Sequence, residues 1–330
     1  MRTHGVPAFV MWEPHLYRIL YILPDLRNEN TASEFQRTKI LCQSSNEREY
    51  CVRVSTIRKV IMVITSLVEN TSCRPDVGQE HGLSLFIQSG GHTILFDFGQ
   101  SELFCENASA LGADLTSVQF GVLSHGHYDH GGGLRRFLQV NTHANVYVSR
   151  AAFEKHYNAK NKYIGLDEEL CGSSRLIPVD SELLLAPQIR IMNCQSQRLI
   201  TPIEPFGLTV MKENALIPED FRHEQYLEIT EGGKKVLFSG CSHRGILNIV
   251  EWTKPDVLVG GFHFMKVSLD REGKKKLRMV AEQLMSYNTI YYTCHCTGIP
   301  QYTYLKEIMG DRLHYVSAGT VIRGFHEYVE

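Results

Sequence analysis

A cluster of potential metal ligands occupies residues 124–134, which read Ser-His-Gly-His-Tyr-Asp-His-Gly-Gly-Gly-Leu. His125, His127, Asp129 and His130 offer three imidazoles and one carboxylate, the side chains that bind zinc-type divalent ions. His125 and His127 can project to one side of an extended turn and bind one ion, while Asp129 and His130 can reach a second ion. A chance gathering of polar residues in a loop is the alternative, and the density of the motif disfavours it. The sequence therefore predicts a site for two divalent metal ions.

Apolar segments precede each group of histidines and predict the elements that position them. Residues 120–124 predict a short strand that ends at the first cluster, and residues 235–239 and 289–293 predict two more strands. The segments 240–245 and 293–298, each with a histidine within two residues of a cysteine, follow these two strands. Because ligands on α/β sheets tend to lie at the carboxyl ends of strands, we expect these distant segments to converge.

The two later segments supply the remaining ligands that a two-metal site needs. His243 lies two residues after Cys241, so the two side chains point to the same side of an extended chain, and His243 can be the third ligand of the first ion. In the same way, His295 would complete the ligand set of the second ion. Cys241 is either a thiolate ligand or a small buried side chain behind the ligands. Cys294 and Cys296 alternate with His295, so we expect them to point away from it.

Strand-like and helix-like segments alternate along the rest of the chain. We expect strands at 60–68, 83–88, 93–97, 145–148, 208–211, 226–230 and 257–259, and helices at 101–111, 151–158, 246–252 and 271–287. Residues 1–57 show no sustained period and are interpreted as an N-terminal extension, disordered or dispensable. Residues 58–330 are then a single catalytic domain.

Composition limits the class of protein. The chain has 34 basic and 36 acidic residues, and its densest basic run is the triplet at 274–276, so we expect no nucleic-acid partner. Nine cysteines at irregular spacing indicate a reduced compartment. No secretory signal is recognisable, and no apolar run approaches the roughly 20 residues that a membrane helix needs. A cytoplasmic enzyme without a membrane partner is therefore expected.

The string His-x-His-x-Asp-His at 125–130, with the strand before it and Phe-Asp-Phe-Gly at 96–99, resembles the metallo-β-lactamase superfamily. The resemblance extends from about residue 58 to the C-terminus. It implies an α/β fold, a four-layer αβ/βα sandwich in which two mixed β-sheets pack face to face, helices cover the outside and the active site lies along one edge. Many members have a metal-bridging acidic residue where this chain has Cys241, and this departure puts a simple transfer of the ligand set in doubt.

Three further segments narrow the resemblance to one branch of the superfamily. They are Gly-Cys-Ser-His at 240–243, Gly-Gly-Phe-His at 260–263 and His-Cys-Thr-Gly at 295–298. The branch is named for 7,8-dihydropterin-6-methyl-4-(beta-ribofuranosyl)aminobenzene 5′-phosphate synthase. Tyr128 and the segment 223–225 also look like this branch. Its name implies a condensation that joins a dihydropterin methyl group bearing a leaving group to a ribosylated aminobenzene phosphate.

Three residues have more than one possible role. His263 is either a general acid or hydrogen-bond donor to the substrate, or a half-buried histidine between two core phenylalanines. Arg244 could hold a phosphate at the start of a helix or be a surface residue, and Tyr128 is assigned with it to substrate binding. His223 lies where other branches place a metal-binding histidine, and we expect it instead to have a structural role or to support a ligand from behind.

These observations predict a metal-dependent hydrolase that acts on a small, phosphorylated molecule. Two divalent ions would lower the pKa of a bridging water and stabilise charge on a phosphoryl oxygen, and Asp129 would both ligate a metal and orient that water. Zinc is favoured, with manganese or iron as alternatives. The pterin-linked synthase, with a pterin-like substrate, is the second hypothesis. A non-hydrolytic or di-iron redox module is the third, and it is disfavoured because di-iron relatives tend to use glutamate where His127 stands. The oligomeric state is left open.

Overall fold

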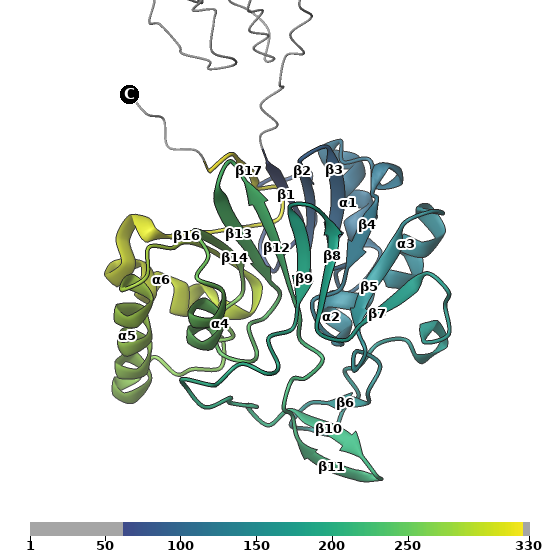
Figure 1. Ribbon diagram of the computed structural model, residues 1–330. Helices are drawn as coiled ribbons and strands as arrows, with labels where there is room; N and C mark the ends of the chain where they lie inside the picture. Colours follow the sequence, from purple (N-terminus) through teal and green to yellow (C-terminus); the bar gives the residue numbers. More distant parts are fainter. Residues whose placement is uncertain (1–61, 326–330) are drawn as a thin grey trace, which may run out of the picture. The chain divides into compact units, whose positions relative to one another are not determined.

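Two seven-stranded sheets form the centre of the protein in a computed structural model that describes residues 62–325 (Figure 1). The strands of the first sheet are β1 (Val63–Val68), β2 (Ser84–Ser89), β3 (His92–Phe96), β4 (Phe120–Val122), β5 (Asn145–Ser149), β7 (Leu176–Val179) and β17 (Val321–Arg323). Those of the second are β8 (Glu182–Ala186), β9 (Ile189–Met192), β12 (Tyr226–Glu231), β13 (Lys234–Ser239), β14 (Val257–Gly260), β15 (Ile290–Thr293) and β16 (Leu313–Tyr315). A small third sheet contains β6 (His156–Tyr157), β10 (Thr209–Lys212) and β11 (Ala215–Pro218).

Each large sheet has an antiparallel half and a parallel half. The first sheet has the order β17-β1-β2-β3-β4-β5-β7, and its pairs become parallel from β3 onward. The second has the order β16-β15-β14-β13-β12-β9-β8, and its parallel half runs from β13 to β16. Both sheets are therefore mixed, which confirms the predicted architecture.

Helices cover the outer face of each sheet (Figure 1). The helices are α1 (Leu103–Leu111), α2 (Tyr128–Gly131), α3 (Leu134–Val140), α4 (Ile246–Thr253), α5 (Arg271–Met285) and α6 (Ile299–Met309). Short 3-10 turns are η1 (Leu115–Ser117), η2 (Glu168–Leu170), η3 (His295–Thr297) and η4 (Gly310–Arg312). α1 and α3 lie on the first sheet and α4, α5 and α6 on the second, so the layers have the order helix, sheet, sheet, helix.

Three apolar clusters hold these layers together. Between the sheets, Phe96 of β3 meets Phe238 of β13 with ring centroids 5.9 Å apart. Under the helices of the first sheet, Phe137 packs in a second cluster, and Leu284 of α5 packs in a third cluster over the second sheet. Truncation of one such buried phenylalanine to alanine typically costs about 3–5 kcal/mol, so the clusters are strong enough to fix how the strand ends meet.

The α5 helix shows how the sequence specifies these elements. The side chain of Asp270 accepts a hydrogen bond from the Gly273 N–H at 2.9 Å and caps the first turn. Leu277, Ala281 and Leu284 recur at helical spacing and are buried against the sheet. The charged residues of α5, including the triplet 274–276, lie on the other faces of the helix.

Most predicted elements are confirmed within a few residues, and one is wrong. Residues 151–155 form turns instead of the expected helix, and His156 and Tyr157 join β10. The Met211 N–H donates to the Lys155 carbonyl, so pairing with a distant strand satisfies this backbone instead of a helix. The predicted N-terminal extension at 1–57 lies outside the described residues. Among the helices that are described, none combines the length and apolar character needed to cross a membrane.

Candidate metal centre

Five strand ends meet at one edge of the sandwich, where α2 lies at the lower side of Figure 1. Asp97 follows β3, and His125 begins the loop after β4. In the second sheet Cys241 follows β13, His263 follows β14 and His295 follows β15. Since parallel strands end at the same edge, residues that are far apart in sequence come together there.

Left-handed backbone conformations recur at these strand ends. Asp97, Ser242, His263 and His295 have φ angles of 61°, 56°, 56° and 49°. Residues other than glycine adopt such angles at a cost of order 1–3 kcal/mol, and they persist where surrounding structure holds them. Their concentration at one edge indicates that the fold maintains strained backbone in order to aim these side chains inward.

Close backbone packing determines the path of the first loop. Gly126 stands between two of the predicted ligands, and a Cβ there would lie 2.1 Å from the Ala152 carbonyl oxygen. Only glycine fits this approach without a shift of the backbone. The turn after β5, which contains Ala152, therefore packs directly against this loop at the centre of the site.

The three ligands predicted for the first ion form one group. The ligand atoms of His125, His127 and His243 lie within 4.8 Å of one another, and all three residues are buried. The Nε2 atoms of His125 and His243 are 3.2 Å apart. Bonds of 2.0–2.1 Å to a tetrahedral zinc place two nitrogens about 3.3 Å apart, so this spacing fits a shared cation. Phe221 stacks on His243 with centroids 4.4 Å apart and holds its ring in place.

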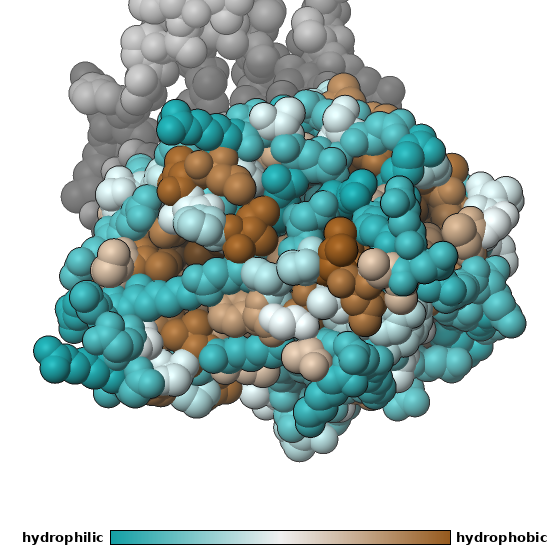
Figure 2. Space-filling view, turned by 90° about the horizontal axis from the view of Figure 1, so that it is seen from below, coloured by the Kyte–Doolittle hydropathy of each residue, from teal (hydrophilic) through white to brown (hydrophobic). Residues whose placement is uncertain are grey.

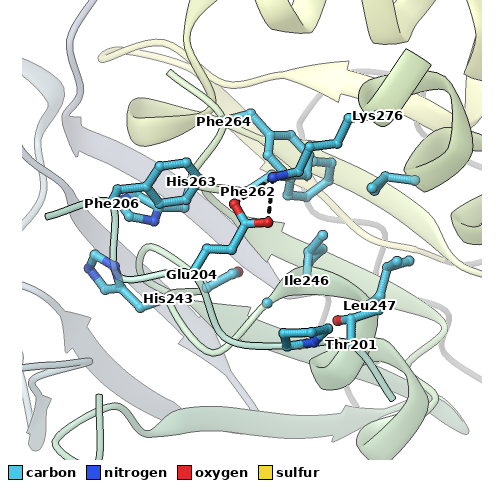
Figure 3. A pocket seen from close by; sticks show the side chains of 14 residues that line it. Thr201, Glu204, Phe206, His243, Ile246, Leu247, Phe262, His263, Phe264 and Lys276 are labelled. Atoms are coloured by element: carbon cyan, nitrogen blue, oxygen red, sulfur yellow. Dashed lines mark hydrogen bonds and ion pairs between the residues drawn. The ribbon is translucent and has the colours of Figure 1, made fainter. Parts of the chain in front are cut away.

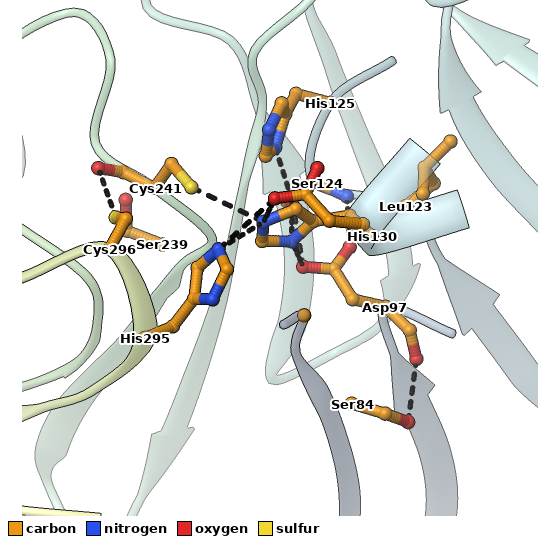
Figure 4. Close-up of polar contacts among 12 residues, drawn as sticks. Ser84, Asp97, Leu123, Ser124, His125, His130, Ser239, Cys241, His295 and Cys296 are labelled. Carbon is orange, nitrogen blue, oxygen red and sulfur yellow. Dashed lines mark hydrogen bonds and ion pairs between the residues drawn. The ribbon is translucent and has the colours of Figure 1, made fainter. Parts of the chain in front are cut away.

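The second group contains Asp129, His130 and His295 (Figure 4, where His130 and His295 are drawn). His295 Nε2 lies 3.2 Å from His130 Nε2 and 3.3 Å from an Asp129 oxygen. The outer nitrogens are already engaged, because His130 Nδ1 donates to Asp97 at 2.7 Å and His295 Nδ1 donates to Asn70 at 2.8 Å. This pattern leaves both Nε2 lone pairs facing inward, as in histidines that bind metals.

A single buried carboxylate orients ligands of both groups. Asp97 is fully buried and accepts hydrogen bonds from the backbone N–H and the hydroxyl of Ser124, at 2.7 and 2.8 Å. The Ser124 oxygen in turn lies 2.8 Å from His125 Nδ1 and can accept its proton. Burial raises the pKa of the Asp97 carboxyl well above its ordinary value, while the bonds from Ser124 oppose that rise. Asp97 therefore fixes the tautomers of His125 and His130.

Cys241 lies between the two groups. Its sulfur is 3.2 Å from His130 Nε2, and it belongs to one group of ligand atoms with His125 and His130 and to another with His295 and Cys296. Burial raises the pKa of the thiol well above its ordinary value, so a nearby cation would be needed to hold it as thiolate. The position of the sulfur therefore allows the ligand role, and its burial also fits the other role expected for Cys241.

The two cysteines that flank His295 point in different directions, and only one of them points away from the site. Cys294 is buried in the core between the sheets. Cys296 turns toward the site, where its sulfur contacts the Cys241 carbonyl oxygen at 3.4 Å. The expectation of simple alternation fails because residues 295–297 form the turn η3 and not an extended strand.

Three contributors were missed from the sequence. His81 Nε2 lies 3.2 Å from an Asp129 oxygen and joins Asp129 and His295 in a ligand group. Asn70 orients His295, and Glu69 accepts the His295 N–H at 2.6 Å. They lie in the loops after β1 and before β2, where no motif marks them.

Burial keeps the clustered histidines neutral. Desolvation, followed by the charges of neighbouring histidines, lowers the pKa of His125, His127 and His243 well below the ordinary value. Desolvation likewise lowers the pKa of His130 to about 3. Burial alone would raise the pKa of Asp129, but the adjacent histidines hold it well below its ordinary value. Neutral imidazoles at these four histidines and an ionised Asp129 are the protonation states that metal binding requires.

A further polar cluster lies behind His127. His127, His156, Glu219 and His223 are all buried, and their ligand atoms lie within 4.8 Å of one another. His156 Nδ1 donates to Glu219 at 2.8 Å. His223 Nδ1 accepts the Gly126 N–H at 2.8 Å, so a neutral His223 carries its proton on Nε2 and offers no lone pair there. This tautomer favours the supporting role expected for His223.

The structure places two of the residues assigned to substrate contact at one cavity and the third outside it. Tyr128 and His263 both line a cavity of about 190 Å³, the metal cleft, together with Asp129, Cys241, His243 and His295. Desolvation, with a smaller effect of Lys266, lowers the pKa of His263 to about 3, which favours a neutral hydrogen-bond donor over a general acid. Arg244 is buried and lies 5.3 Å from the centre of the Trp252 ring, outside the residues that line the cleft. The phosphate contact expected for Arg244 is therefore not supported.

The donor set fits divalent metal binding. Imidazole nitrogens, the Asp129 carboxylate and the thiols of Cys241 and Cys296 converge there. His127 Nε2 and His243 Nδ1 are buried without a partner in the described structure. Figure 2 views the molecule from below and shows apolar side chains recessed among polar ones on this face. The site can therefore place a small molecule against bound metal ions.

Comparisons with known proteins agree with this geometry. Residues 77–264 match the family model described as the metallo-beta-lactamase superfamily. An uncharacterized protein of Methanocaldococcus jannaschii is 30% identical over 74% of this chain and 94% of its own length. The 7,8-dihydropterin-6-methyl-4-(beta-D-ribofuranosyl)-aminobenzene-5′-phosphate synthase of the same organism is 25% identical over 74% of this chain and 90% of its length. The crystal structure of Tm1679, described as a metal-dependent hydrolase of the beta-lactamase superfamily, is 26% identical, has a TM-score of 0.65, and the match covers 79% of this chain and 98% of that one.

Proposed function

Because this chain belongs to the metallo-beta-lactamase superfamily, we propose that it is a metal-dependent hydrolase of a small, phosphorylated molecule, working with two divalent ions. One observation carries the proposal. The Nε2 atoms of four histidines meet in two pairs, each 3.2 Å apart, with an ionised carboxylate beside the second pair. In the second pair the outer nitrogens donate to Asp97 and Asn70, so two Nε2 lone pairs face each other without a proton between them. A cation between these lone pairs would remove their repulsion, and this supports metal binding.

Six residues would hold the metal ions, and two more lie close to them. His125, His127 and His243 would hold one ion, and Asp129, His130 and His295 the other, with zinc favoured over manganese or iron. Cys241 lies between the groups and His81 beside the second. When bound, the ions would supply acidification of a water molecule and stabilisation of negative charge on a phosphoryl oxygen.

The chain's own side chains would organise the reaction around those ions. Asp129 is ionised and faces the cleft, so it can accept a hydrogen bond from the attacking water and orient it. His263 is neutral and lines the same cleft, so its N–H can donate to an oxygen of the substrate. Tyr128 is half-buried at the cleft and can contact the substrate through its hydroxyl.

A synthase is the second candidate. The relative that is a dihydropterin-linked synthase shares 25% identity with this chain over 90% of its own length. In that case the same residues would bind a pterin-like substrate and assist departure of a leaving group instead of attack by water.

Elemental analysis of the purified protein, paired with two turnover assays, distinguishes the candidates. The assays use bis(4-nitrophenyl) phosphate, and a dihydropterin pyrophosphate with ribosylaminobenzene phosphate. Two zinc or manganese ions per chain with ester cleavage support the hydrolase, and a condensation product supports the synthase. Purified protein that binds neither metal, even after incubation with excess, would contradict both.

Substitutions locate the activity at the proposed centre. Asp129→Ala and His125→Ala should each lose metal and activity but remain soluble and folded. His314→Ala is the matched control, because His314 stacks on Tyr292 in β15 and belongs to none of the ligand groups. Unchanged metal content in both cleft variants would rule out the site.

A further inference from the structure

A second cavity, of about 250 Å³, adjoins the metal cleft. His243 and His263 line both cavities, so a molecule that fills this one reaches the metal cleft across these two rings. Three phenylalanines, Phe206, Phe262 and Phe264, contribute to its walls (Figure 3). We call this cavity the aromatic pocket.

Neighbouring rings of the aromatic pocket meet edge to face. Phe206 meets His263 at 90° with centroids 5.2 Å apart, and His263 meets His243 at 71° and 4.2 Å. Phe206 has a left-handed backbone with a φ of 49°, as does His263 at 56°. Because this strained backbone aims both rings at one cavity, the pocket is a built feature and not a packing gap. Rings in edge-to-face contact leave faces on which a planar group can stack.

One ion pair crosses the mouth of the pocket. Lys276 of α5 contacts Glu204 of the loop between β9 and β10, with Nζ 2.6 Å from a carboxylate oxygen (Figure 3). The ammonium also lies 5.4 Å from the centre of the Phe206 ring. The two side chains are 39% and 49% exposed, and a pair so exposed is weak because water screens its charges. A ligand carboxylate or phosphate can therefore replace Glu204 at little cost.

We propose that the aromatic pocket binds the non-reacting part of the substrate, a planar aromatic ring with an anionic substituent that pairs with Lys276 in place of Glu204. The proposal rests on the proposed function, because the reacting group would extend past His243 and His263 into the metal cleft. The carboxylate of Glu204 already occupies the position of the ligand's anion. An aliphatic chain would fill the volume but would gain nothing from the orientation of the rings.

Binding of simple probes to the purified, metal-containing protein tests this directly by calorimetry. The probes are 2-naphthoate, its uncharged amide 2-naphthamide, and cyclohexanecarboxylate, which keeps the charge without the aromatic ring. We expect naphthoate to bind more tightly than both others. Glu204→Gln should strengthen naphthoate binding by roughly fivefold and leave naphthamide unchanged, because only the anion competes with Glu204. Lys276→Gln should remove the preference for naphthoate over naphthamide.

Lys274→Gln is the matched control. It removes the same charge from the same helix, but the Lys274 ammonium lies 5.7 Å from the centre of the Tyr304 ring, outside the pocket lining. Lys274→Gln should therefore bind naphthoate as the unchanged protein does. An equal effect of both lysine substitutions would show only a long-range charge effect and would overturn the proposal. Equal affinity for naphthoate and cyclohexanecarboxylate would also overturn it.

A final comparison separates this inference from the proposed function. Naphthoate could instead bind metal ions in the cleft, so its affinity is also measured in Asp129→Ala. Binding that survives Asp129→Ala and is lost in Lys276→Gln supports the aromatic pocket, whether or not the protein cleaves esters. Binding that is lost in Asp129→Ala and unchanged in Lys276→Gln overturns the pocket and leaves the hydrolase proposal standing.

Discussion

Replacement of Asp97 by asparagine should weaken metal binding through a change of histidine tautomer. The carboxylate accepts from His130 Nδ1 at 2.7 Å, from the Ser124 N–H at 2.7 Å and from the Ser124 hydroxyl at 2.8 Å. Asparagine can still accept the backbone N–H with its carbonyl oxygen, but its NH₂ group would then face His130. To avoid two opposed donors, His130 must carry its proton on Nε2, the atom that points at His295.

The size of the effect follows from the bond that is lost. A hydrogen bond to a charged group contributes about 1.5–3 kcal/mol, and loss of such a partner behind a metal ligand typically lowers metal affinity about 10–100-fold. The fold should survive, because burial raises the pKa of Asp97 and a neutral side chain at this position removes a desolvated charge.

Chelator competition and nitrogen NMR of the histidine rings measure the two consequences separately. Asp97→Asn should lose affinity for the ion near His130 and should move the His130 proton from Nδ1 to Nε2. Asp256→Asn is the control, since Asp256 also accepts a backbone N–H, from Lys235 at 2.8 Å, but precedes β14 at its opposite end. A folded Asp97→Asn protein with unchanged metal affinity would refute the reasoning.

Two further predictions concern histidines around the cleft. The pKa of His263 is lowered to about 3, so a neutral His263 stabilises the fold above pH 6.5 and that contribution is lost as the pH falls below 6.5 toward 3. When the pH is lowered from 7.5 to 5.5, the metal-stripped protein should lose about 1.4 kcal/mol more of its free energy of unfolding than the His263→Gln variant does. Urea denaturation measures both losses, and equal losses would contradict the lowered pKa of His263. Glu219→Gln removes the carboxylate behind His156, and chelator titrations should show an affinity about tenfold weaker for the ion near His127. Glu228→Gln is the control, because it alters a carboxylate paired with Arg190 and should leave that affinity unchanged.

The sequence alone determined the fold class and the six principal ligand candidates. The His-x-His-x-Asp-His string is dense and local, and the apolar runs before it, before Cys241 and before His295 fix which strand ends carry polar side chains. Because parallel strands end at a common edge, these local signals were enough to predict that the ligands converge.

Only the tertiary structure decided which side chains support those ligands. Asp97, Asn70, His81 and Glu219 act through contacts that span many positions in sequence, and no local spacing marks such contacts. The same holds for Arg244, whose place near a helix start suggested phosphate but whose side chain is buried against Trp252. Local patterns record which face of a strand is apolar, whereas the partner across a site depends on how two sheets pack, and that information lies in the whole core.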